Sequence, residues 1–203
     1  MRSFVILAIL TACDLEAEVD DRDFKPAPSP ATCLVIEEVL YTPSSGPALG
    51  WQWVNVDNRC SSAVELANAE LRWTRSGAGW VNKMPLSGLG MLPAWGCITV
   101  GGPKSAPSNA APEYDLAKPF MPAITDPGLL GTAAGVGLFV AGSKLPVAAV
   151  IFGDENLEGI VGVDGEAALT TNIGAVAKGH SMRLYAGRWI DGIFPEPEHC
   201  GIY

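Results

Sequence analysis

The stretch Trp51-Gln52-Trp53-Val54-Asn55-Val56-Asp57 decides the fold class, because its side chains alternate with the two-residue period of a β-strand. Apolar groups occur on both of its faces, as expected for a strand inside a β-sandwich. The chain around it consists of short apolar runs cut by glycine and proline. Six of these runs predict further strands, at residues 34–41, 71–74, 96–101, 136–140, 147–152 and 181–185. Seven short strands with turn residues between most of them predict an all-β sandwich.

The order of these runs resembles the lamin-tail domain, an immunoglobulin-like β-sandwich. Residues 34–39 resemble its first strand, L-V-I-x-E-V, and residues 52–58 resemble its second, E-W-V-E-L-Y-N. Its pattern L-P-x-G-x-x-x-V-x resembles residues 92–100. The resemblance covers residues 34–186 and implies an immunoglobulin-like fold. It also implies a loop and a strand at residues 62–71, although Ser62 and Glu65 have the spacing of a helix capping box, because tertiary context overrides local propensity.

The N-terminus is typical of an export signal. Arg2 supplies a positive charge, and the apolar run at residues 4–10 is much shorter than the roughly 20 residues that a membrane-spanning helix needs. Residues 10–13, Leu-Thr-Ala-Cys, resemble the lipobox of bacterial lipoproteins. This resemblance implies that residues 1–12 are removed and that Cys13 is acylated, which would place the protein in a bacterial cell envelope, facing the periplasm or the cell surface.

Residues 13–32 are predicted to form a tether between the lipid and a single domain at residues 33–203. Six acidic residues lie between positions 14 and 23, and three prolines follow between positions 26 and 30. Charge repulsion and proline stiffness keep such a segment extended. The acidic run lacks the glycine turn and the distal glutamate of a calcium loop, so we predict no metal site and no cofactor.

Five cysteines support the same compartment. Acylation of Cys13 leaves Cys33, Cys60, Cys97 and Cys200, an even number that predicts two disulfides in an oxidising space. Four cysteines allow three pairings. We favour Cys33–Cys200, which would join the two ends of the domain, together with Cys60–Cys97. No two of these cysteines have the short spacing of a zinc knuckle.

Composition and motifs argue against nucleic-acid binding and against catalysis. The net charge is −9 and no Lys/Arg cluster is present to neutralise phosphates. The histidines are His180 and His199, and no G-x-S-x-G elbow occurs. Asp154 and Glu158 could form a carboxylate pair for hydrolysis, but a solvated turn explains them better. We therefore predict a non-catalytic, lipid-anchored interaction module.

Its predicted partners are the membrane, through the N-terminal lipid, and an unknown envelope protein or glycan. The alternative prediction is a glycan-binding module, because aromatic faces stack on the apolar faces of sugars. Among the six tryptophans, Trp80 is flanked by glycines and is the first candidate for an exposed position, and Trp95 is the second. The proline-rich loop at residues 103–128 would contribute to the same surface.

Overall fold

The structure is a computed structural model that describes residues 33–43, 52–74, 79–101, 134–152, 156, 159–168, 170, 171, 173, 176–197 and 200. Antiparallel strands make up nearly all of the regular secondary structure in these residues. The strands in chain order are β1 (Leu34–Leu40), β2 (Trp53–Asn58), β3 (Val64–Glu65), β4 (Ala69–Trp73), β5 (Asn82–Pro85), β6 (Met91–Leu92), β7 (Cys97–Gly101), β8 (Ala134–Val140), β9 (Ala148–Phe152), β10 (Ser181–Tyr185) and β11 (Arg188–Ile193). A short 3-10 helix, η2 (Ser87–Leu89), precedes β6.

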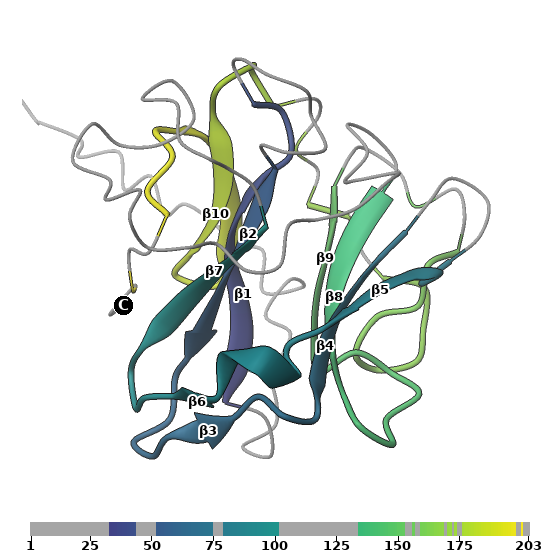
Figure 1. The fold of residues 1–203 in the computed structure, drawn as a ribbon. Coiled ribbons are helices and arrows are strands. Elements are labelled where there is room, and N and C mark those ends of the chain that lie inside the picture. The colour runs from purple at the N-terminus through teal and green to yellow at the C-terminus, as the bar shows by residue number, and fades with distance from the viewer. Residues whose placement is uncertain are drawn as a thin grey trace, which may run out of the picture.

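Two antiparallel sheets face each other across the core (Figure 1). The larger sheet has the order β11-β10-β1-β2-β7, and the smaller has the order β5-β4-β8-β9. A two-stranded ribbon of β3 and β6 lies at one end of the sheets (Figure 1). The core cluster draws alternate residues from both sheets, for example Val54 and Val56 from β2, and Val136 and Leu138 from β8. The predicted all-β sandwich is therefore confirmed.

Each of the seven predicted strands has a counterpart in the structure. Residues 62–71 form β3, a turn and the start of β4, so the helical propensity of this segment is overridden. The reason is visible in β4, where Leu71 and Trp73 point into the core and pair with β8 at strand register. Four strands were not predicted, namely β3, β5, β6 and β11.

A β-bulge in β1 places two consecutive glutamates, Glu37 and Glu38, between the core residues Ile36 and Val39. Ile36 lies opposite Val56, and Glu38 lies opposite Asn55, so Glu37 is the extra residue. Both glutamates are buried. The bulge allows Ile36 and Val39 to face the same core although they are three residues apart.

The predicted signal at residues 1–12, the tether at residues 13–32 and Cys13 all lie outside the described residues. Within the described part of the chain, no helix is long and apolar enough to cross a membrane.

Candidate functional site

Trp95 lies in the turn between β6 and β7, with a backbone conformation that L-residues seldom adopt. Its φ is +57° and its side chain is 57% exposed. A bulky residue with positive φ costs about 1–3 kcal/mol relative to an ordinary conformation. A glycine at this position would adopt the positive φ without this cost. This turn therefore displays a large aromatic side chain at the expense of stability.

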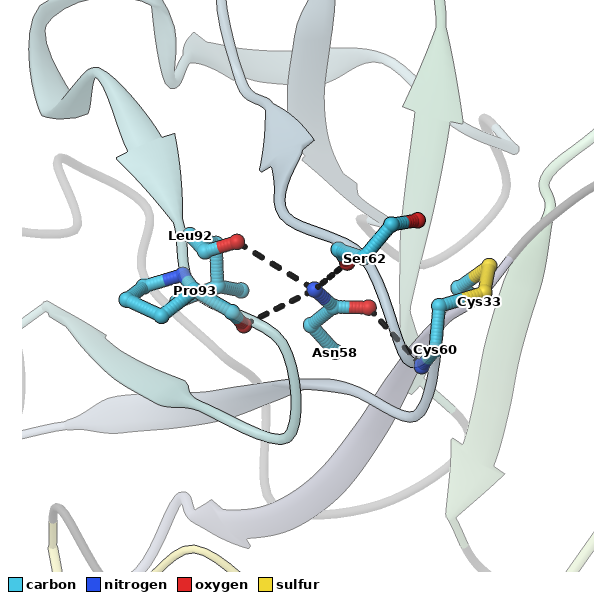
Figure 2. Close-up of a disulfide and its surroundings, with 6 residues drawn as sticks. All are labelled: Cys33, Asn58, Cys60, Ser62, Leu92 and Pro93. Atoms are coloured by element: carbon cyan, nitrogen blue, oxygen red, sulfur yellow. Dashed lines mark hydrogen bonds between the residues drawn. A yellow bond between two sulfur atoms is a disulfide. The ribbon is translucent and has the colours of Figure 1, made fainter.

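Hydrogen bonds hold the turn in place. The Trp95 N–H donates to the carbonyl oxygen of Cys60 at 3.2 Å, and the Gly96 N–H donates to that of Pro93 at 3.0 Å. Beneath the turn, the Asn58 side chain connects the two segments (Figure 2). Its Nδ2 lies 2.8 Å from the Ser62 carbonyl oxygen and 2.8 Å from that of Pro93, and its Oδ1 accepts the N–H of Cys60 at 3.0 Å.

We call residues 59–63 and 93–96 the Trp95 corner. The Asn58 amide also lies within 3.2 Å of the Leu92 carbonyl oxygen, so its donors serve the backbone of the corner (Figure 2). Because a buried carbonyl without a donor is unfavourable, this one side chain keeps both segments together. The corner is a rigid support for the exposed ring of Trp95.

The disulfide at this corner corrects the pairing favoured from the sequence. Cys33 bonds to Cys60 and Cys97 bonds to Cys200, each with a Cα–Cα distance of 5.1 Å. Strand register explains the difference. Leu34 lies opposite Asn58, which brings Cys33 beside Cys60, whereas Cys97 lies opposite Asp57 rather than Cys60.

The second disulfide fixes the C-terminal segment, residues 194–197 and Cys200, to the edge strand β7 of the larger sheet. This segment also reaches β1 and β10. The Glu196 N–H donates to Glu38 Oε1 at 3.2 Å, and the Glu196 carboxylate lies 2.7 Å from Arg183 Nη2. The segment is thus attached to β1 and β10 through Glu196 and to β7 through Cys200.

A buried ion pair lies at the centre of these contacts. Arg183 donates to Glu38 Oε2 from Nε at 3.0 Å and from Nη2 at 2.7 Å, and the Ser181 hydroxyl donates to Glu38 Oε1. Burial raises the pKa of Glu38, and the effect of desolvation exceeds the opposing effect of Arg183. Burial lowers the pKa of Arg183, but the charges and hydrogen bonds of Glu38 and Glu196 together outweigh burial and raise this pKa. The cluster fastens β1, β10 and the C-terminal segment together.

Trp80 does not share a surface with Trp95. Its Nε1–H donates to the Val161 carbonyl oxygen at 3.0 Å, and its ring meets Phe139 edge-on with centroids 5.7 Å apart. A Cβ atom at Gly137 would lie 3.2 Å from the Trp80 ring, so that glycine leaves room for it. Trp80 is partly buried on the outer face of the smaller sheet. The prediction of an exposed Trp80 is wrong, whereas Trp95 is exposed as predicted.

The other site residues considered in the sequence analysis are either engaged in the fold or lie outside the described residues. The Ser181 hydroxyl is engaged with Glu38, and the neighbouring His180 has a buried Nδ1 without a hydrogen-bond partner among the described residues. Asp154, Glu158, His199 and the loop at residues 103–128 lie outside the described part of the chain. Within that part, no three His, Cys, Asp or Glu side chains are grouped to hold a metal ion.

Two functional features escaped the sequence reasoning. The role of Asn58 depends on carbonyl oxygens 34 and 35 residues away in sequence, and no local pattern indicates it. The positive φ of Trp95 is likewise not indicated by composition or periodicity, because tryptophan seldom adopts it.

No family model matches this chain, and no curated protein or solved structure matches it significantly. The resemblance to the lamin-tail domain, with its immunoglobulin-like topology, therefore stays a prediction.

Proposed function

We propose that this chain is a non-catalytic, lipid-anchored interaction module of a bacterial envelope. Acylated Cys13 would hold it to the membrane, the acidic residues 13–32 would form a tether, and the sandwich would contact its partner. The observation that carries the proposal is the Trp95 corner, where an exposed tryptophan with a strained backbone is mounted on a disulfide-braced turn. Tryptophan side chains held rigidly at a surface are common in binding sites.

The anchor is tested by fractionating cells that express the full chain. We expect the protein in the membrane fraction, released by detergent, and we expect Cys13→Ala to remain unprocessed and to lack the lipid. Ser3→Ala serves as the control, because it alters the same N-terminal segment but leaves residues 10–13 unchanged. If Cys13→Ala were processed and bound to the membrane like the parent protein, the anchor would be refuted.

The interaction is tested by cross-linking the full chain in envelope membranes and recovering it in detergent. A single protein recovered in a stoichiometric amount supports the interaction module. The second candidate function is a glycan-binding module that uses Trp95, and the exposed ring of this residue is the observation that favours it. Polysaccharide that is retained by the parent protein, released by soluble sugar and lost in Trp95→Ala would establish that function instead.

A further inference from the structure

The Trp95 corner is unusual in its charge. The whole chain has 22 acidic and 13 basic residues, yet the nine residues of the corner contain no carboxylate and a single charged side chain, Arg59. Ser61, Ser62, Ala63, Pro93 and Trp95 are exposed. Glu65, opposite Met91 in the β3–β6 ribbon, is the next acidic residue along the chain beyond the first segment of the corner. A surface of this composition can approach lipid without placing carboxylates against it.

The corner also lies where the domain joins the segment that leads to the lipid. Cys33, the first residue of the domain, is bonded to Cys60 of the corner, and its carbonyl oxygen accepts the N–H of Arg59 at 2.8 Å. Trp95 in turn donates its N–H to Cys60. Only 20 residues separate Cys13 from Cys33 (33 − 13), and a chain of that length spans at most about 70 Å. The attachment point and the exposed tryptophan therefore belong to the same end of the sandwich.

We infer that the Trp95 corner is the face by which the anchored domain contacts the lipid bilayer, with the Trp95 ring at the interface between headgroups and acyl chains. This inference rests on the proposed lipid anchor, and it makes the bilayer, rather than a protein or a glycan, the partner of the Trp95 corner. Tryptophan favours that interface because its ring is apolar and its N–H remains hydrogen-bonded to water or headgroups. Arg59 supplies the one charge that a lipid phosphate pairs with.

The composition of the corner favours a bilayer over a glycan. A sugar site needs several polar side chains around its aromatic platform to bind the hydroxyl groups. The Asn58 amide cannot serve, because it is hydrogen-bonded to the backbone of the corner. The other polar side chains of the corner are Arg59 and the short hydroxyls of Ser61 and Ser62, and none is a carboxylate or an amide. A bilayer requires only an exposed aromatic ring, few charges and a place at the end of the domain where the proposed tether joins it. Trp95 and the composition of the corner supply the first two, and the Cys33–Cys60 disulfide supplies the third.

The test uses the full lipidated protein in phosphatidylcholine vesicles whose acyl chains are brominated near the headgroup, because bromine quenches tryptophan at short range. We expect lower tryptophan emission in brominated than in unbrominated vesicles for the parent protein. Trp95→Phe is expected to abolish most of this difference. Trp189→Phe is the matched control, since Trp189 packs against the core from β11, and we expect it to retain the difference.

The possible outcomes distinguish a failure of the bilayer contact from a failure of the proposed lipid anchor. Mass spectrometry of the N-terminus and vesicle flotation establish whether Cys13 is acylated and the protein is bound. An unmodified Cys13 would refute the anchor and the bilayer contact together. Acylated, vesicle-bound protein without quenching, or with equal quenching in Trp95→Phe, would refute the contact and leave the anchor standing. A shift of Trp95 emission on adding envelope polysaccharide, without bromine quenching, would assign the corner to a glycan.

Discussion

The two disulfides hold two regions with opposite properties. Cys33–Cys60 braces the Trp95 corner, where an aromatic side chain is exposed and its backbone is strained. Cys97–Cys200 holds the C-terminal segment against a sheet whose outer face contains the buried, hydrogen-bonded ion pair of Glu38 and Arg183. In the first region an unfavourable backbone conformation lowers stability while the Trp95 ring is exposed. In the second region charged groups are buried and fasten the C-terminal segment to the sheet. Under the proposed function, the first region would bind the partner and the second would stabilise the fold.

The largest effect on stability is expected in the region held by the Cys97–Cys200 disulfide. Cys97→Ser with Cys200→Ser opens a loop of 103 residues, and we expect a loss of about 4–5 kcal/mol in the free energy of unfolding in the chain-entropy model. Cys33→Ser with Cys60→Ser opens a loop of 27 residues and should cost roughly 3–4 kcal/mol. Urea unfolding of both double variants checks the order. An equal or larger loss at Cys33–Cys60 would contradict the stabilising role of the C-terminal segment.

The ion pair predicts the next effect. Arg183→Met leaves Glu38 buried without its cation, so we expect a loss of about 3–5 kcal/mol in the free energy of unfolding. Arg188→Met, on the exposed strand β11, removes an equal charge and should change it by less than about 0.5 kcal/mol. Thermal and urea unfolding measure both. A similar small change in the two variants would mean that the pair does not fasten the segment.

The hydrogen bonds that support the Trp95 corner are tested by substituting Asn58. Asn58→Ala leaves the carbonyl oxygens of Ser62 and Pro93 without their donor, and we expect a loss of about 2–3 kcal/mol. It should also increase hydrogen exchange at the amides of Cys60 and Trp95. Asn68→Ala, in the exposed turn before β4, is the matched control and should have little effect. Unchanged exchange at the corner in Asn58→Ala would show that the disulfide alone holds it.

Sequence periodicity was sufficient to predict seven of the strands, but it missed the short strands β3, β5 and β6 and the longer strand β11. Residues 53–58 alternate clearly, so β2 was predictable, whereas β3 and β6 contain two residues each and have no period to detect. The strand β11 was missed because Gly192 interrupts it, with a φ of +69° at a shift in register against β10.

The site was less predictable because it depends on contacts between distant residues. The cysteine pairing follows from the register of β1, β2 and β7, which composition does not reveal. Flanking glycines suggested an exposed Trp80, but Gly135 and Gly137, more than fifty residues later, make the space in which it packs. The exposure of Trp95 was predicted, while the strain in its backbone required the structure.

The raised pKa of Glu38 predicts a smaller effect, a change of the free energy of unfolding with pH whose sign is fixed. Burial raises its pKa in the folded state above the ordinary value of 4.5. A carboxyl that holds its proton more tightly when folded stabilises the fold below the unfolded pKa, and this contribution is lost as the pH rises through the folded pKa. Taken as parent minus Glu38→Gln, the difference in free energy of unfolding should therefore decrease as the pH rises above about 4.5. An increase of this difference with pH would show that Arg183 outweighs desolvation.

The smallest expected effect is a gain in the free energy of unfolding at Trp95, whereas the substitutions above are expected to lower or barely change it. Trp95→Gly removes the cost of a positive φ, and after allowing for the greater freedom of glycine in the unfolded chain we expect about 1 kcal/mol of added stability. Ala186, with a φ of +46° in the turn between β10 and β11, gives the matched control. Ala186→Gly should also stabilise the fold but leave the quenching by brominated lipid unchanged, whereas Trp95→Gly should abolish it. A destabilised Trp95→Gly would mean that the ring supports the fold, and the argument that this residue is retained for binding would fail.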